Sequence, residues 1–296
     1  MTQFKVRFAK ESDRETVLKF CEHTWQDSPD YIHLVWDIWF KDDRGKIFIV
    51  TNSEDIPIAM RRVVLMSENE SWWEGFRVDP LYRQHFLAII SLVEKYIARY
   101  LQENNIKISR SCVWSNSKTM QAFTARRKKR TQIGKYALYK SQPIQSYSDR
   151  LFKLNLDDCE QIYSLITQYN YYPQSKANEI IYASLGDKCQ ELNKLQIEER
   201  IRSGKIWGLK EAKNIKNIAI ESPTTIDRQQ LWIGYICGET ETMSDFLIEL
   251  KKLAYCQKCS NIGLFVTHRE SILKSLFKAA YERAEKQDLF VYEWEN

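Results

Sequence analysis

Two related hexapeptides decide the fold of this chain: WEGFRV at residues 73–78 and WIGYIC at residues 232–237. Each precedes a long amphipathic segment, after which a strand and another helix are expected. The tetrapeptides VWSN at residues 113–116 and VTHR at residues 266–269 then occupy corresponding places. A chance recurrence of the short pattern is the alternative, but the matching order of elements favours a duplicated domain.

The pattern of apolar residues around the first hexapeptide predicts a regular order of elements. Strands are expected at residues 4–8, 46–51, 56–66, 72–78, 106–114 and 136–139. Helices are expected at residues 11–24, 31–40 and 85–103 and from Asn116 onward, the first with Ser12 as its cap and Glu15 three residues later. The predicted fold class is therefore α/β (α+β), with two tandem domains that each contain a mixed, mostly antiparallel sheet flanked by helices.

Length and charge agree with two domains. The chain has 296 residues, and its first 150 hold 25 Lys and Arg against 18 Asp and Glu, whereas the remainder is slightly acidic. A turn-like, charge-poor segment, SQPIQSYS at residues 141–148, lies at this division. We predict one domain at residues 1–145 and a second at residues 149–296.

Several broad classes of protein are disfavoured by composition. Hydrophobic residues make up 44% and charged residues 28%, as in folded globular domains. The charged start of the chain and the lack of a long apolar run predict a cytoplasmic protein without a membrane span. Seven scattered cysteines are expected to be reduced thiols, and the lone C-x-x-C at residues 256–259 is a weak metal or redox signal. Because the four histidines are also scattered, no metal site is expected.

The segment EGFRVDPLYR at residues 74–83 resembles the GNAT N-acetyltransferase superfamily. Members commonly read E-x-[L/F]-x-V-x-P-x-[Y/H]-[R/Q] where the fourth strand enters the acyl-CoA loop. Asn116, followed seven residues later by Phe123, resembles the family's asparagine with a tyrosine at that distance. The resemblance extends to the order of elements over residues 4–140. It implies a GNAT fold and an enzyme that moves an acetyl group from acetyl-CoA directly to the amine of a small molecule or amino acid.

The resemblance also implies a set of contacts with acetyl-CoA. A coenzyme A pyrophosphate needs backbone N–H donors at a helix start, where the helix dipole favours negative charge. Two departures from the family are Phe86 in place of a glycine and Phe123 in place of a tyrosine that often protonates the leaving thiolate. The implied contacts are Phe76, Arg77, Val78, Arg83, Gln84, His85, Phe86, Leu87, Ala88, Asn116 and Phe123.

Glu74 is the candidate general base, because a carboxylate beside the cleft can accept the proton that the amine must lose. The alternative is a structural role on an outward face or in an ion pair with Arg77 or Arg61. Family geometry places the acceptor pocket near the early helices, with candidates Trp25, Tyr31, His33 and Trp36.

The second copy is expected to be structural or to cover the substrate. It has Ile233 where the first copy has Glu74, and the segment GETETMSD at residues 238–245 is acidic where the first copy has Arg83 and His85. Such acids stabilise a helix N-terminus but repel a pyrophosphate.

A second class of function is a catalytically degenerate GNAT-fold protein that binds a ligand or a partner. The basic run RRKKR at residues 126–130 would allow such a protein to bind nucleic acid. The aromatic residues nearby form no stacking platform, however, so nucleic acid is not the expected partner. The expected partner is a small-molecule amine, and the oligomeric state is left open.

Overall fold

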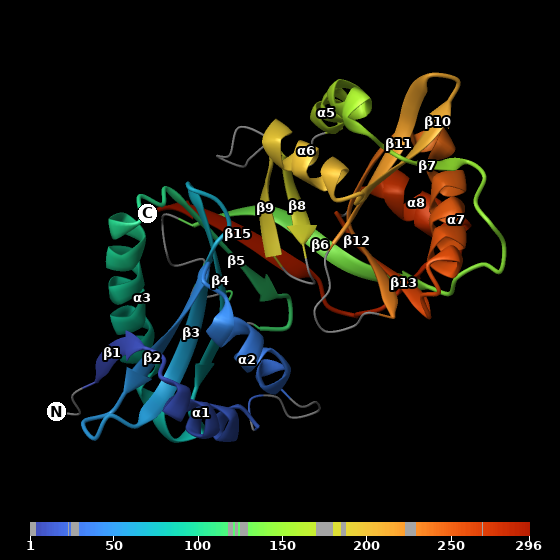
Figure 1. Ribbon diagram of the computed structural model, residues 1–296. Coiled ribbons are helices and arrows are strands. Elements are labelled where there is room, and N and C mark those ends of the chain that lie inside the picture. Colours follow the sequence, from blue (N-terminus) through green and yellow to red (C-terminus); the bar gives the residue numbers. More distant parts are fainter. Residues whose placement is uncertain are drawn as a thin grey trace. The chain divides into compact units, whose positions relative to one another are not determined.

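The computed structural model describes residues 4–22, 24, 30–117, 121, 124, 130–169, 180–184, 188–222, 229–267 and 269–296. The chain divides into two compact units, which are residues 1–111 with 294–296 (unit 1) and residues 112–293 (unit 2) (Figure 1). Both are mixed α/β structures with mostly antiparallel sheets, as the sequence predicts. The predicted domains, residues 1–145 and 149–296, were placed by the repeated order of elements, and their bounds differ from those of the compact units. This division into domains stays a prediction.

Unit 1 is built on the five strands that the sequence predicts before residue 115. They pair in the order β1-β2-β3-β4-β5, antiparallel except for the parallel pair β4 and β5. The parallel pair requires a crossover, which α3 provides. The bounds are β1 (Lys5–Phe8), β2 (Gly45–Thr51), β3 (Pro57–Leu65), β4 (Glu70–Val78), β5 (Ile108–Trp114) and α3 (Phe86–Glu103).

Helices cover both faces of this sheet (Figure 1). Along β2, Phe48 and Val50 pack toward α3, whereas Ile47 and Ile49 pack toward the helices on the other face. Those helices are η1 (Glu11–Asp13), α1 (Arg14–Cys21) and α2 (Ile32–Lys41). The prediction that Ser12 caps the first helix is wrong: Asp13 is the residue before α1, and its carboxylate accepts a hydrogen bond from the Lys10 N–H at 2.7 Å.

Unit 2 has the strand order β15-β6-β13-β12-β11-β10-β7, with β14 also paired to β6 and a separate hairpin of β8 and β9. Strand β6 is longer than the predicted strand at residues 136–139, because β15 pairs with its first half, residues 131–136, and β13 with its second half, residues 136–141. The bounds are β6 (Thr131–Ser141), β7 (Leu151–Lys153), β8 (Ile180–Ser184), β9 (Lys188–Leu192), β10 (Ile206–Glu211), β11 (Asn214–Glu221), β12 (Gln230–Gly238), β13 (Asn261–Thr267), β14 (Glu282–Arg283) and β15 (Leu289–Glu295).

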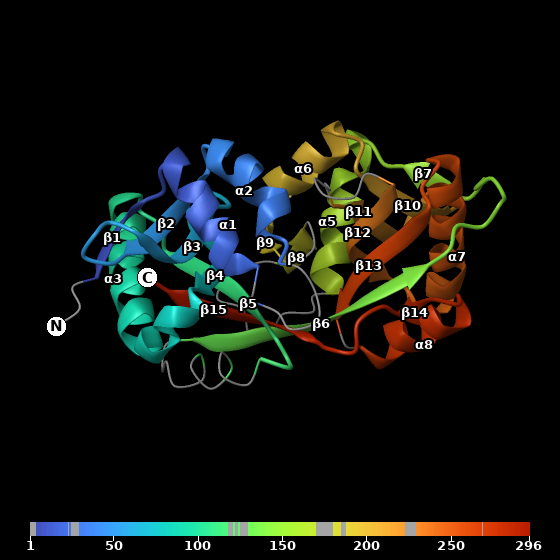
Figure 2. The ribbon, with the colours of Figure 1, turned by 90° about the horizontal axis from the view of Figure 1, so that it is seen from below.

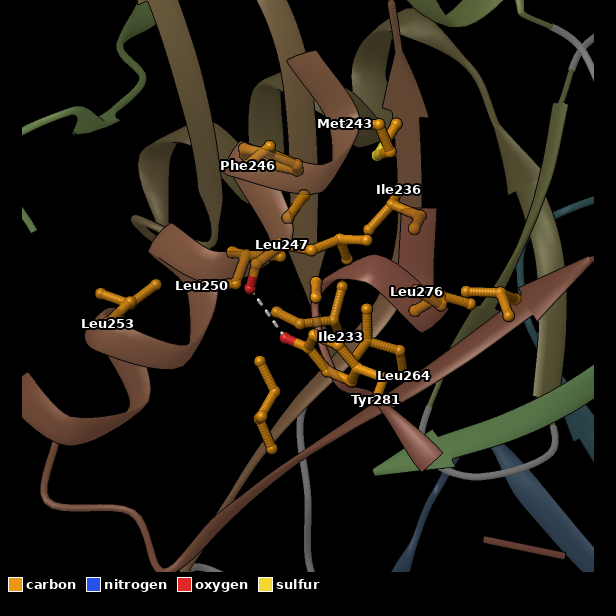
Figure 3. Close-up of a cluster of buried hydrophobic side chains, with 14 of the residues drawn as sticks. Ile233, Ile236, Met243, Phe246, Leu247, Leu250, Leu253, Leu264, Leu276 and Tyr281 are labelled. Atoms are coloured by element: carbon orange, nitrogen blue, oxygen red, sulfur yellow. Dashed lines mark hydrogen bonds between the residues drawn. The ribbon is translucent and has the colours of Figure 1, made fainter. Parts of the chain in front are cut away.

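The helices of unit 2 also lie on both faces of its sheet. They are η3 (Leu156–Asp158), α5 (Cys159–Gln168), α6 (Lys194–Arg202), α7 (Thr240–Cys256) and α8 (Glu270–Lys278). Helices α7 and α8 lie side by side (Figure 2). Beneath α7, Phe246 and Leu250 pack on strand residues, and the Tyr281 hydroxyl donates a hydrogen bond to the Leu247 carbonyl at 3.0 Å (Figure 3).

The described part of unit 2 contains little of the helix predicted from Asn116, most of which lies outside the described residues. Among the helices that the structure does describe, none combines the length and the apolar character needed to cross a membrane.

Candidate functional site

The first hexapeptide forms a bulge at the point where the parallel strands separate. Pairing between β4 and β5 runs from Glu70–Ile108 to Trp73–Ser111, and in the described residues it goes no further, although β4 continues to Val78. On the other side of β4 the register shifts, so that Gly75 and Phe76 together lie opposite Arg61. The end of β4 therefore has backbone groups that β5 does not use.

Gly75 is required at this bulge. Its φ is +65°, and a Cβ built there would lie 2.8 Å from the Trp39 ring. A side chain would therefore be strained by the backbone and would also displace Trp39.

Glu74 lies in a buried ion-pair network whose partners differ from those the sequence suggests. Arg62, which is 1% exposed, pairs with Glu74 and with Asp42, the latter at 2.6 Å. The same guanidinium lies 4.9 Å from the centre of the Trp39 ring. The Glu74 side chain keeps 12% of its surface exposed. Arg62 thus fixes one carboxylate oxygen of Glu74 beside the bulge.

The network also acts on Asp42. Burial raises the pKa of Asp42, but the Arg44 backbone N–H and the Arg62 guanidinium together outweigh burial, so the pKa lies below its ordinary value. Asp42 consequently carries a negative charge, and it shares the Arg62 guanidinium with Glu74.

Arg77 is held by a second buried ion pair. Its Nη2 donates to Asp30 at 3.1 Å and its Nε to the same carboxylate at 2.5 Å, while the Tyr31 ring lies 5.3 Å from the guanidinium. Burial lowers the pKa of Arg77, but the hydrogen bond to Asp30 outweighs it, and the net pKa is raised. Because Asp30 also accepts from the Ile32 N–H at 3.1 Å, this pair ties the start of α2 to β4.

The start of α3 is open and lacks acidic side chains. The chain leaves β4 through Asp79, whose carboxylate accepts from the Leu81 N–H at 2.9 Å, and then forms η2 (Pro80–His85). The N-cap residue His85 makes no capping hydrogen bond with its side chain, and the first turn contains no acid. The Phe86 N–H donates to the Arg83 carbonyl of η2, and the rest of the first turn of this 18-residue helix, with its positive dipole end, is a place where an anion is favoured.

The side chains around this start leave it accessible. Arg83, Gln84, Leu87 and Ala88 are exposed. The Phe86 ring, in contrast, contacts the Phe76 ring edge-to-face at 5.8 Å. The bulky residue that replaces the expected glycine thus packs on β4.

The start of α7 in unit 2 is different, although β12 and β13 also separate after a few parallel pairs. Asn217 donates to the Glu239 carbonyl at 3.0 Å and accepts from the Thr242 hydroxyl at 2.5 Å, and Lys216 pairs with the Glu239 carboxylate at 2.8 Å. Only Glu239 separates β12 from α7. This helix start is therefore filled by side chains of its own unit.

The space between β12 and β13 is almost closed. The cavity there measures about 10 Å³ and is lined mostly by aromatic and aliphatic residues, including Tyr235, Ile236 and Phe265. That volume is about the size of a single water.

Comparison with known proteins shows the fold. A GCN5-related N-acetyltransferase from Sphaerobacter thermophilus matches with a TM-score of 0.65 and 12% identity over 99% of this chain and 95% of that one. A tandem GNAT protein from the clavulanic acid biosynthesis pathway matches with a TM-score of 0.57 and 12% identity over 99% and 98%. The chain has the GNAT fold.

More distant acyl-CoA enzymes share this fold. Saccharomyces cerevisiae N-myristoyltransferase, solved with myristoyl-CoA, matches with a TM-score of 0.52 and 8% identity over 99% of this chain and 78% of that one. Comparison with protein-family models gives no match, and comparison with curated protein sequences gives none either. At these identities the likeness extends to the GNAT fold and no further.

The structure brings together only part of the predicted site. Glu74, Phe76–Val78 and Arg83–Ala88 lie on one continuous stretch from the β4 bulge to the first turn of α3. Asn116 is exposed in the turn after β5, whereas Phe123 lies outside the described residues. The contacts predicted for all these residues stay predictions.

The predicted acceptor residues differ in exposure. Trp36 is 1% exposed and packs in the core between α1, α2 and the sheet. His33 is exposed and its Nδ1 lies 2.6 Å from the Asp30 carbonyl, while Tyr31 packs edge-to-face on Trp39 at 6.0 Å. Trp25 lies outside the described residues. Sequence reasoning missed Arg62, Asp42 and Asp30, and the glycine at the centre of the hexapeptide was the available sign of a bulge.

Proposed function

We propose that the chain is an acyl-CoA-dependent N-acetyltransferase that moves an acetyl group from acetyl-CoA directly to the amine of a small molecule. The observation that carries this proposal is the open, acid-free start of α3 immediately after the β4 bulge. The GNAT fold supports it, because acetyl-CoA in the family binds where these two features meet.

The N–H groups of Leu87 and Ala88 would hold the pyrophosphate, with Arg83 adding positive charge. The Phe86 N–H already donates to the Arg83 carbonyl. The backbone of Phe76–Val78, which lies beyond the last described β4–β5 pair, would hydrogen-bond the amides of the pantetheine arm. Asn116 and Phe123 would lie beside that arm. The residues fit the group, because the exposed first turn of α3 carries no negative charge that would repel phosphates.

In the proposed reaction, the substrate amine attacks the thioester carbonyl, the nitrogen–carbon bond forms and the carbon–sulfur bond breaks. Glu74 accepts the proton of the amine. Arg62 holds one oxygen of Glu74 in place, so the other oxygen is oriented for the transfer. Phe123 has no proton to give, and the departing thiolate would be protonated by water.

Unit 2 would not bind a second acetyl-CoA. Its helix start is occupied by Asn217, Thr242 and Glu239, and the space between its parallel strands is about 10 Å³. We propose that this part of the chain is structural or covers the substrate.

Titration with acetyl-CoA by calorimetry tests the proposal. We expect one site per chain, and Arg83→Ala should weaken binding by about tenfold because a charge-assisted contact to phosphate is lost. Arg99→Ala is the matched control, since Arg99 is an exposed arginine near the other end of the same helix. No saturation in the millimolar range would refute acetyl-CoA binding.

A second candidate function is a non-catalytic GNAT-fold protein that binds a ligand or partner. It is favoured by Phe86, which replaces the glycine that normally lets phosphates approach the backbone closely. Acetyl-CoA binding without turnover of any amine in a broad panel would select this function. The basic residues 126–129, through which such a protein would bind nucleic acid, lie outside the described residues.

A further inference from the structure

Unit 2 has a polar cavity away from the space between β12 and β13. It measures about 660 Å³ and is formed by the ends of β6, β13 and α7 together with β14. The charged and amide residues that line it are Lys140, Gln142, Lys251, Asn261, Glu282 and Arg283. Asn261 begins β13, so the cavity is at the opposite end of that strand from the place where β12 and β13 separate.

Lys251 is the unusual group in this cavity. The residue is 8% exposed, its ammonium donates one hydrogen bond to the Ala279 carbonyl at 3.1 Å, and it lies 5.6 Å from the centre of the Tyr281 ring. No carboxylate pairs with it in the part of the chain that the structure describes. Burial lowers the pKa of Lys251. A buried ammonium without a counterion is costly, and an anion in the cavity would offset that cost.

The balance of charge favours an anion. Lys140 is exposed, lies 5.7 Å from the centre of the Trp232 ring, and forms no ion pair within the described residues, although Glu282 is its register partner. The Arg283 guanidinium is already paired with Asp288. Besides the paired Arg283, two lysines and the single acid Glu282 line the cavity, which leaves an excess of positive charge.

We propose that this cavity binds a small oxyanion, with inorganic phosphate as the simplest example. Its oxygens would accept hydrogen bonds from Lys251 and Lys140. The proposal does not depend on acetyl-CoA binding in unit 1.

Calorimetric titration of the full chain with inorganic phosphate, in a buffer without other oxyanions, tests this site. Lys251→Met should weaken binding by about tenfold or more and Lys140→Met by a smaller factor, because each removes a charge-assisted hydrogen bond. Lys274→Met is the matched control, since Lys274 is exposed on α8 and should leave the affinity within about twofold.

Three results would overturn the proposal. One is the absence of saturable phosphate binding below about 20 mM. Another is equal weakening by Lys274→Met and Lys251→Met, which would indicate a general charge effect. The third is loss of phosphate binding in Arg83→Ala but not in Lys251→Met, which would place the anion at the start of α3. If Lys251→Met does not fold, the exposed Lys140→Met variant gives the same comparison.

Discussion

Glu74 is the residue on which the proposed chemistry depends most directly. Glu74→Gln keeps the shape of the side chain but cannot accept the proton of the amine, so kcat should fall by about 100-fold or more at neutral pH. Acetyl-CoA affinity should change by less than about twofold, because the proposed contacts lie on the backbone of β4 and α3. Steady-state kinetics and calorimetry measure the two quantities.

The matched control for this substitution is Glu68→Gln, since Glu68 is exposed in the turn before β4. An unchanged kcat in Glu74→Gln would leave Glu74 as a purely structural partner of Arg62. Equal losses of kcat and of acetyl-CoA affinity would instead indicate that the substitution disturbs the bulge.

At the residue scale, the sequence predicts which positions carry charge but not which charges meet. The interpretation of Glu74 as a paired residue named Arg61 and Arg77, whereas the partner is Arg62. The bulge at Gly75 shifts the register by one residue, so that Arg62 lies opposite Glu74, where the register of Ala59–Val78 and Met60–Arg77 would have placed Val63. Asp30 was missed for a different reason, since its partner is 47 residues further along the chain.

At the scale of elements, Glu221 joins two strands to the end of α7. Its carboxylate accepts hydrogen bonds from Lys205 at 2.7 Å, Trp207 at 2.6 Å and Gln257 at 3.0 Å. Burial raises the pKa of Glu221, but these hydrogen bonds outweigh burial, so the pKa lies below its ordinary 4.5. The stabilisation is therefore complete above the unfolded-state pKa and is lost as the pH falls through the folded-state pKa.

Glu221→Gln should lower the free energy of unfolding by about 1–3 kcal/mol at neutral pH, because buried donors lose a charged acceptor. The difference from the unsubstituted protein should shrink as the pH falls below the folded-state pKa of Glu221. Urea unfolding across this acidic range measures it. Glu211→Gln, an exposed position on β10, should show neither effect. A difference in unfolding free energy that grows as the pH falls would contradict a lowered pKa of Glu221.

The elements themselves were largely predictable from local patterns. The strands and helices of residues 4–103 form where apolar periodicity places them, because each has one face against a core. Strand β6 is the exception: it extends beyond the predicted residues 136–139 because β13 and β15 pair with it, and these partners lie more than a hundred residues away. The hairpin of β8 and β9 was not predicted either.

At the level of the whole molecule, the compact units differ from the predicted domains both at residues 112–145, which belong to unit 2, and at the end of the chain. Residues 294–296 belong to unit 1, although they follow unit 2 along the chain. Trp294 is 7% exposed and packs edge-to-face on Trp73 at 5.2 Å. The Asn296 side chain accepts from the Ser109 hydroxyl at 2.7 Å and donates to the Ile106 carbonyl at 3.1 Å. These residues complete the core beneath the β4 bulge.

Trp294→Ala should therefore destabilise unit 1 by about 3–5 kcal/mol, because it leaves a cavity against Trp73. Hydrogen exchange should become faster in β4 and β5, and acetyl-CoA binding should weaken as the bulge loses its support. Phe277→Ala is the control, since Phe277 is 84% exposed on α8. If both substitutions leave exchange in β4 unchanged, Trp294 does not support the site. A truncation after residue 148 is a poorer test of unit 1, because it removes Trp294 and Asn296 from its core.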